Sequence, residues 1–243
     1  PRENGFKLDP RQIGTACDSK TRALILNYPS NPTGASYARK ELKEIARVVE
    51  KRNLMVISDE IYNELTYDFE HTPFACLDGM KKRTVLLDGF SKAYAMTGWR
   101  VGFACGPREI ISAMTKIHQY TIMCVPIMGQ MAGIEALKNG RKAVEEMKRE
   151  YKRRREFIVN GLNDIGLDCH KPQGAFYVFP SIKSTGMSSG DFATSLLKKE
   201  KVAVVPGTAF GPSGEGYVRM SYASSLDNIK EALTRISRYV SAL

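Results

Sequence analysis

The stretch TVLLDGFSKAYAMTGWR, residues 84–100, joins a short apolar run to a polar cluster that holds a lysine and an arginine. The apolar run TVLLD has the length and the composition of a buried strand. Lys92 follows this run closely, so we expect burial at the strand end to favour its neutral, nucleophilic amine. Arg100, eight residues further on, could fix a phosphate. The alternative is a surface lysine and arginine beside an ordinary turn, because both residue types are mostly exposed in proteins.

Two apolar runs further upstream also end in polar clusters. The run ALIL leads into NYPSNPTG, residues 27–34, and the run LMVI leads into SDEIY, residues 58–62. Between them, residues 37–52 carry apolar side chains at helical spacing. Strands that alternate with helices predict a parallel sheet in an α/β fold. Ligands bind such sheets at the carboxyl ends of the strands, which is where all three polar clusters fall.

The three clusters carry groups that suit pyridoxal phosphate, which needs a lysine for its Schiff base and an anchor for its phosphate. Asp59 could pair with the protonated pyridine nitrogen of that cofactor, and Asn31 and Tyr62 could donate to its ring hydroxyl oxygen. The alternatives are a helix N-cap for Asp59 and an ordinary turn for NPTG. The order of these groups, ahead of Lys92 and Arg100, favours the cofactor interpretation.

Five motifs, in this order, resemble the class I/II aminotransferases of the fold-type-I pyridoxal-phosphate family: NPTG, SDEIY, SKAYAMTGWRVGF, GAFYVFP and VRMSYA. The resemblance covers essentially all 243 residues. It implies that the cofactor is pyridoxal 5'-phosphate. It also implies that Lys92 forms the Schiff base with this cofactor and that Asp59 pairs with the pyridine nitrogen.

The same resemblance implies four further contacts. Asn31 and Tyr62 would bind the ring hydroxyl of the cofactor, and Arg100 would bind its phosphate. Arg219, in VRMSYA, would bind the α-carboxylate of the substrate. A planar guanidinium suits this role because it offers two parallel N–H donors to a carboxylate.

The chain departs from the family pattern in two ways. Many relatives have a phosphate-binding hydroxyl three residues before the lysine, where this chain has Gly89. The nearest hydroxyl is Ser91, which we expect to contact the phosphate unless it serves only as a small residue in a close turn. The chain also opens at PRENGFKLDP, which lies well inside the family's large domain, so we expect an N-terminally truncated fragment. Such a fragment would lack a glycine-rich helix start that binds phosphate.

The order of the runs predicts a chain in three parts. Residues 1–106 are expected to form part of the large cofactor-binding domain, with a mostly parallel sheet, flanking helices and a last strand in RVGFACG. Residues 107–165 are expected to form connecting helices. Residues 166–243 are expected to form a small C-terminal α+β domain with strands in FYVFP, VAVVP and YVRMSY. Its expected helices are DFATSLLKKE and LDNIKEALTRISRYV.

The formal net charge is +10, and basic residues concentrate in residues 138–155. This stretch could be a nucleic-acid patch, but Val144, Met147 and Tyr151 belong to an apolar stripe at helical spacing. It also lacks the interleaved aromatic residues that would stack on bases. We therefore expect a solvated amphipathic helix and no nucleic-acid partner.

Other features of the sequence exclude several classes of protein. No run of about 18 apolar residues occurs, which predicts no membrane span. The five cysteines lie at spacings that match no zinc site, and the three histidines do not cluster with them. We therefore expect reduced thiols, a cytoplasmic location and no metal.

These observations predict a pyridoxal-phosphate-dependent aminotransferase that moves an amino group between an amino acid and a 2-oxo acid. Lys92 is the expected base for the α-proton, and the cofactor ring takes up the resulting charge. Phe176, Tyr177 and Phe210 could line the substrate pocket or simply pack the core. A β-elimination lyase of the same fold and a catalytically incompetent fragment are the alternatives. The full-length protein is expected to be a homodimer.

Overall fold

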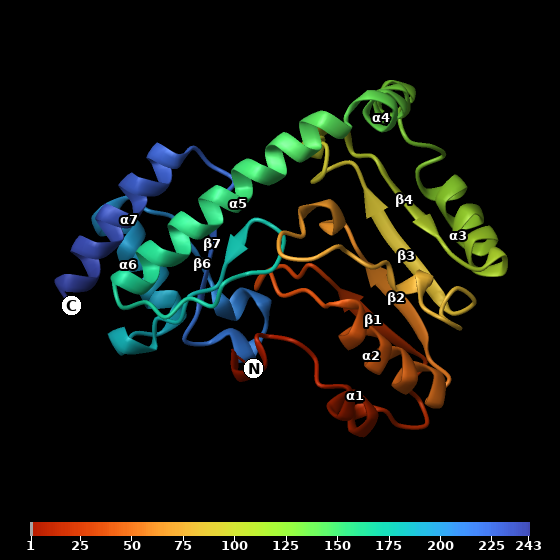
Figure 1. Cartoon of the computed structure of the whole chain (residues 1–243), viewed down its shortest axis with the longest axis horizontal. Coiled ribbons are helices and arrows are strands. Elements are labelled where there is room, and N and C mark those ends of the chain that lie inside the picture. The colour runs from red at the N-terminus through yellow and green to blue at the C-terminus, as the bar shows by residue number, and fades with distance from the viewer. Residues whose placement is uncertain (1) are drawn as a thin grey trace.

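The computed structural model describes residues 2–243 and contains a four-stranded sheet in the spatial order β1-β2-β3-β4 (Figure 1). The strands are β1 (Ala23–Asn27), β2 (Met55–Asp59), β3 (Thr84–Gly89) and β4 (Gly102–Cys105). β1 pairs with β2, and β2 with β3, in parallel, as the alternation of strands and helices predicts. The predicted α/β fold class is therefore confirmed.

β4 runs antiparallel to β3, unlike the other strand pairs. Residues 90–101 connect the two strands and hold only the short 3-10 helix Thr97–Trp99. A parallel neighbour needs a long crossover connection, whereas a direct return of the chain produces an antiparallel neighbour. The predicted strand in RVGFACG is present, and it makes the sheet mixed rather than wholly parallel.

One face of the sheet is covered by α2 (Arg39–Lys51), which lies within the predicted helical stretch (Figure 1). Leu42, Ile45 and Val49 of this helix are fully buried, and they pack in one core with Leu26 and Val56 of the strands. These helix positions recur at the spacing of an amphipathic helix, so the apolar stripe fixes which side faces the sheet.

A short helix, α1 (Pro10–Ala16), was not predicted from the sequence. The Asp9 carboxylate caps its start by accepting a hydrogen bond from the Arg11 backbone N–H at 2.9 Å. Pro10 lies in the first turn, where a missing backbone N–H has little cost. Asp followed by Pro is a usable start signal. Only Ile13 of this helix is buried, so the apolar pattern is too short to reveal it.

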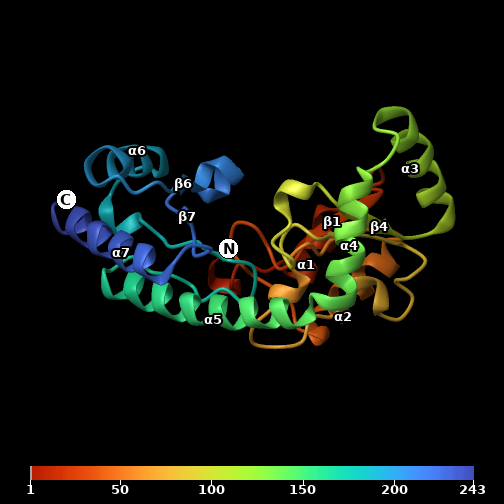
Figure 2. The ribbon, with the colours of Figure 1, turned by 90° about the horizontal axis from the view of Figure 1, so that it is seen from above.

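Three helices follow the sheet within residues 107–165, the range in which connecting helices were predicted. They are α3 (Arg108–Thr121), α4 (Ile127–Asn139) and α5 (Arg141–Asp164). α5 is 24 residues long and extends from the sheet region to the C-terminal region (Figures 1 and 2). The three-part division of the chain at residues 106 and 165 stays a prediction. Within residues 2–243, none of the helices is long and apolar enough to cross a lipid bilayer.

The C-terminal region contains a small antiparallel sheet in the order β5-β7-β6. Its elements are β5 (Tyr177–Val178), α6 (Ser189–Glu200), β6 (Val205–Pro206), β7 (Val218–Ser221) and α7 (Leu226–Ser241). The strands in FYVFP and VAVVP are shorter than predicted, with two residues each. Leu162 of α5, Phe192 of α6 and Val218 of β7 are fully buried in the core that joins these elements.

The basic helix α5 differs from its prediction at one residue. Arg155 is fully buried, so the expectation that every charge of this helix is solvated is wrong at this position. Its guanidinium donates to the Asp68 carboxylate at 2.7 and 2.8 Å and to the Pro172 carbonyl at 2.7 Å. It also lies 4.7 Å from the centroid of the Tyr67 ring. These contacts join the loop after β2 to the start of the C-terminal region.

Candidate active site

The carboxyl ends of β1, β2 and β3 lie side by side at one edge of the sheet (Figure 1). The strand register places Asn27 opposite Asp59, and Asp59 opposite Leu87. The three polar clusters follow these strand ends directly. The parallel pairing therefore brings the loops that carry Asn31, Asp59 and Lys92 to the same edge.

Asp59 is the last residue of β2 and is half-buried. Its carboxylate accepts one long hydrogen bond, from the Ile61 backbone N–H at 3.3 Å. No Lys, Arg or His forms an ion pair with it within residues 2–243. The next element is the 3-10 helix Asn63–Leu65, so Asp59 does not cap an α-helix, which was the alternative to a ligand role. Its carboxylate is free to accept a further N–H donor.

Arg219 and Asn31 meet although they lie 188 residues apart in the sequence. Arg219, on β7, donates through Nη1 to the Asn31 Oδ1 at 2.8 Å. Its guanidinium carbon lies 4.5 Å from the centroid of the Tyr177 ring and 4.9 Å from that of the Phe210 ring. Two aromatic rings and an amide therefore hold the guanidinium in place, and this hydrogen bond uses only one of its five N–H groups.

Tyr62 and Tyr177 extend this contact chain toward Lys92. Their hydroxyl oxygens lie 3.0 Å apart, and both side chains are buried. Burial, together with the neighbouring Tyr177 hydroxyl, raises the pKa of Tyr62 well above its ordinary value, so its phenol stays neutral and able to donate. The Lys92 Nζ lies 5.8 Å from the centroid of the Tyr62 ring. Asn31, Arg219, Tyr177, Tyr62 and Lys92 thus form one continuous cluster.

Lys92 and Ser91 lie in the turn after β3, and both are half-buried. Within residues 2–243, the Lys92 Nζ takes part in no hydrogen bond and no ion pair. Lys92 is thus neither fully exposed nor fully buried, and its Nζ lies near the Tyr62 ring. An amine without a protein partner is available to react with a carbonyl compound.

Arg100 lies apart from the cluster. It is exposed, its backbone is left-handed with φ of 57°, and its Nη1 donates to the Thr97 carbonyl at 2.8 Å. The structure therefore gathers Asn31, Tyr62, Lys92 and Arg219 by direct contacts, with Asp59 on the neighbouring strand end. It shows no contact that joins Arg100 or the Ser91 side chain to that cluster within the described residues.

The turn that carries Lys92 starts at a close contact between two glycines. Gly89 ends β3 and pairs with Gly102 of β4. A Cβ atom at Gly89 would lie 2.9 Å from the Gly102 Cα and 2.9 Å from the Val101 carbonyl oxygen. This pair lets β4 return directly beneath the Lys92 turn.

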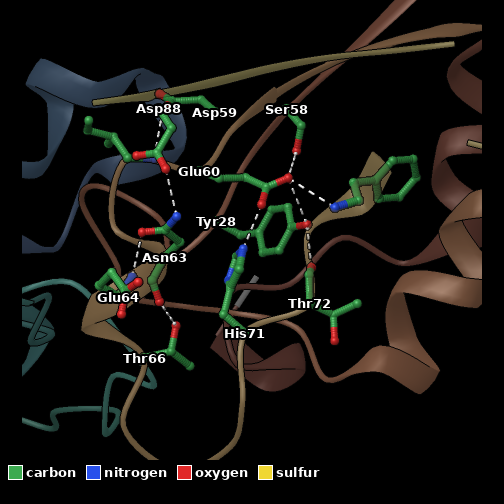
Figure 3. Close-up of polar contacts among 12 residues, drawn as sticks. Tyr28, Ser58, Asp59, Glu60, Asn63, Glu64, Thr66, His71, Thr72 and Asp88 are labelled. Atoms are coloured by element: carbon green, nitrogen blue, oxygen red, sulfur yellow. Dashed lines mark hydrogen bonds and ion pairs between the residues drawn. The ribbon is translucent and has the colours of Figure 1, made fainter. Parts of the chain in front are cut away.

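A buried polar network supports these loops from the other face of the sheet (Figure 3). The Glu60 side chain is fully buried, and its Oε1 accepts hydrogen bonds from the Ser58 hydroxyl at 2.7 Å and the Phe74 N–H at 3.0 Å. It also accepts from the Tyr28 hydroxyl at 3.2 Å. Its Oε2 lies 2.6 Å from the His71 Nε2. The sequence analysis missed this network, although polar Ser58, which is buried in β2, and Glu60, just after that strand, stand at alternate positions, which is a usable signal.

Comparison with known proteins assigns the chain to a family. The sequence model of the family described as aminotransferase class I and II matches residues 1–236. The chain therefore belongs to the class I and II aminotransferases. This assignment confirms the resemblance that the five sequence motifs carry.

Individual relatives agree with the family assignment. YugH of Bacillus subtilis (strain 168) is 56% identical over 238 residues, which are 98% of this chain and 62% of that protein. The aspartate aminotransferase of Pyrococcus abyssi (strain GE5 / Orsay) is 47% identical over 239 residues, which are 97% of this chain and 61% of that protein. The chain thus spans 61–62% of the length of these two relatives.

A solved structure supports the fold. The crystal structure of an aromatic aminotransferase from Pyrococcus horikoshii OT3 matches with a TM-score of 0.97 and 47% sequence identity. The match covers 100% of this chain and 66% of that chain. The arrangement of the mixed sheet and its helices is therefore that of a solved aminotransferase.

Proposed function

We propose that the protein containing this chain is a pyridoxal-phosphate-dependent aminotransferase that moves an amino group between an amino acid and a 2-oxo acid. The observation that carries the proposal is the cluster that runs from Asn31 through Arg219, Tyr177 and Tyr62 to Lys92. It combines an unpartnered amine with a fixed guanidinium at the carboxyl ends of parallel strands. The Pyrococcus relatives, an aspartate aminotransferase and an aromatic aminotransferase, support a transferase rather than a lyase.

The donor set fits pyridoxal phosphate. Lys92 supplies the amine, and Asp59 supplies a carboxylate that has room for one more N–H donor. The neutral Tyr62 phenol and the Asn31 amide can both donate to a ring oxygen, since Asn31 uses its Oδ1 toward Arg219 and keeps its Nδ2 free. For the phosphate we propose Arg100 and Ser91, the nearest guanidinium and hydroxyl along the chain.

Each of these residues has a task that its chemistry explains. When bound, pyridoxal phosphate supplies a conjugated ring that accepts the electron pair left when the substrate Cα–H bond breaks. The Asp59 carboxylate holds the proton on the pyridine nitrogen, which keeps the ring electron-poor. With the cofactor bound, the Lys92 Nζ would take the proton from the substrate Cα and would deliver it to the aldehyde-derived carbon of the cofactor. Arg219 orients the substrate by binding its α-carboxylate through two N–H groups.

We also propose that the full-length protein is a homodimer in the cytoplasm. Several apolar side chains of α3 and α4 support a protein contact, because Ile117 is 69%, Met128 72% and Met131 59% exposed. All five cysteines are unpaired, which is typical of proteins kept in a reducing compartment.

The proposal is tested with the full-length protein, pyridoxal phosphate and a panel of amino donors that includes aspartate and aromatic amino acids. We expect amino transfer that depends strictly on an added 2-oxo acid. Release of pyruvate and ammonia from a sulfur amino acid, without any 2-oxo acid, would instead identify a β-elimination lyase. Absence of a visible cofactor absorbance band in the loaded protein would contradict both activities.

A further inference from the structure

Asp88 is a partly buried carboxylate that the proposed chemistry does not use. It lies on β3, four residues before Lys92, and its Oδ2 accepts a hydrogen bond from the Asn63 Nδ2 at 2.7 Å (Figure 3). Its Oδ1 accepts from the Gly89 backbone N–H at 2.6 Å. Asn63 directly follows Tyr62. The contact therefore joins the strand end before Lys92 to the turn after Tyr62.

In this contact Asn63 must be the hydrogen-bond donor and Asp88 the acceptor. The Asn63 Oδ1 already accepts from the Glu64 backbone N–H at 2.6 Å, so its NH₂ group must face Asp88. Both oxygens of Asp88 are acceptors, and only an ionised carboxylate supplies two acceptors at once. An amide or a protonated acid at position 88 would lose one of the two hydrogen bonds.

We propose that Asp88 is a positioning residue, whose carboxylate holds Asn63 and thereby sets the turn of Tyr62 against the turn of Lys92. This inference rests on the proposed function, because the two turns carry the groups assigned to the cofactor. Asp88 would thereby maintain the distance of 5.8 Å between the Lys92 Nζ and the centroid of the Tyr62 ring.

The surroundings of Asp88 make this contact sensitive to pH. Burial raises the pKa of Asp88 to about 6, against the opposing effect of the hydrogen bonds from Gly89 and Asn63. The Glu60 carboxylate contributes to this rise in the pKa of Asp88, and His71 opposes it. Further charged groups act on the same surroundings: Asp88 and Glu64 both raise the pKa of Tyr94, and Arg141 lowers it. Below about pH 6 the acid form of Asp88 should therefore release one of its two donors.

The test compares four forms of the full-length protein: wild type, Asp88→Asn, Asn63→Asp and the double variant. Asp88→Asn places two NH₂ groups against each other, and Asn63→Asp places two carboxylates against each other. The double variant reverses the polarity but restores every hydrogen bond, because the carboxylate then at position 63 offers two acceptors and the amide then at position 88 offers one donor and one acceptor. Asp78→Asn, at an exposed aspartate, is the matched control.

The first measurement is amide hydrogen exchange of residues 60–66 and 89–95 in the cofactor-free protein. We expect about tenfold faster exchange in Asp88→Asn, because a hydrogen bond to a charged group is worth roughly one to two factors of ten. The second measurement is the dissociation constant for pyridoxal phosphate, which should rise about tenfold in the same variant. Both values should return to within about threefold of wild type in the double variant.

Wild-type exchange in these two segments should also rise as pH falls through about 6, once corrected for intrinsic rates. In the double variant this rise should be absent or displaced. The proposal is overturned if the double variant is no closer to wild type than Asp88→Asn, or if Asp88→Asn matches wild type in exchange. A wild-type protein that binds no cofactor would contradict the proposed function, while the exchange comparison would still decide the role of Asp88.

Discussion

The sheet region, residues 23–105, and the C-terminal region, residues 166–243, bury their apolar side chains differently. The sheet packs one face against α2, whereas its other face leaves Ile25 70% and Phe103 45% exposed. The C-terminal region surrounds its core with helices and a sheet, and Phe192 and Val218 are fully buried there. We call the sheet region the open region, because one face of its sheet is partly exposed. We call the C-terminal region the closed region, because its core is enclosed.

The two regions also carry different chemistry. The open region presents Asp59 from the end of β2 and Lys92 from the turn after β3, while the closed region presents Arg219 from a strand, with its guanidinium close to two rings. The groups assigned to bond breaking therefore lie at the carboxyl edge of the partly exposed sheet, whereas the group assigned to recognition lies on the enclosed C-terminal region. Substitutions in the first region should therefore change turnover, and those in the second should change substrate affinity.

The largest expected effect is that of Lys92→Ala. This change removes the Schiff-base amine and the group that moves the α-proton, so kcat should fall by about 10⁴-fold or more. Steady-state turnover of the full-length protein at saturating substrates measures it. Lys82→Ala, at an exposed lysine outside the cluster, is the control and should keep wild-type kcat. Near-normal turnover in Lys92→Ala would show that Lys92 is neither the Schiff-base amine nor the group that moves the α-proton.

Asp59→Asn should be the next most severe change. A neutral amide no longer stabilises a proton on the pyridine nitrogen, so we expect kcat to fall by about 100-fold. The dissociation constant of the cofactor should change much less than kcat. Full activity combined with a lower melting temperature would show that Asp59 serves only the fold.

Arg219→Lys tests the recognition role of the closed region. Lysine lacks the two parallel N–H donors and the flat face that lies against Tyr177, so the KM for the amino donor should rise by about tenfold to 100-fold. The affinity for pyridoxal phosphate should stay close to wild type. A fall in cofactor affinity with an unchanged KM would mean that the division of roles between the two regions is wrong.

Arg155→Ala tests the connection between the two regions. The change leaves Asp68 and the Pro172 carbonyl without their buried donor. Loss of a buried ion pair costs about 3–5 kcal/mol, and we expect about 2 kcal/mol here because the Asp68 side chain is 39% exposed. Urea unfolding measures the difference, with Arg153→Ala as a control whose side chain is 61% exposed. Equal losses in both variants would show that the connection adds nothing specific.

The smallest expected effect is the pH dependence of the same ion pair. The hydrogen bond from Arg155 lowers the pKa of Asp68 below its ordinary value. The stabilisation is therefore complete above the unfolded pKa of about 3.9 and is lost as pH falls through the folded value. The difference between the melting temperatures of wild type and Asp68→Asn should be present at pH 7 and should narrow progressively as pH falls below about 4. A difference as large at pH 2 as at pH 7 would contradict this account.

Local patterns predicted much of the fold. The helices α2, α5 and α7 lie within or across the stretches in which the sequence predicted helices, because apolar periodicity is a local signal. Arg155 shows a conflict between two signals. It lies on the apolar stripe between Tyr151 and Ile158, so spacing indicated burial while residue type indicated exposure. Only the positions of Asp68, 87 residues away in sequence, and of Pro172, 17 residues away, resolve the conflict.

Only part of the candidate site could be predicted from the sequence. Motif order placed Asp59 and Lys92 on neighbouring strand ends, because parallel strands share one carboxyl edge. The contact between Arg219 and Asn31 spans 188 residues and depends on how the C-terminal region packs, which no local pattern encodes. The pairing of Glu60 with His71 was missed because these residues come from separate loops, although polar Ser58 and Glu60 at alternate positions were a local signal for a buried network.

The glycine pair beneath the Lys92 turn limits how this sequence can diverge or be redesigned. A serine at Gly89 would press its Cβ against the Gly102 Cα and the Val101 carbonyl, which are backbone atoms that cannot rotate away. A single substitution to a hydroxyl-bearing residue at this position is therefore blocked until β4 shifts. Ser91 lies beyond this contact, so any lineage or design that keeps the present strand spacing has to draw a phosphate-binding hydroxyl from the far side of the glycine pair.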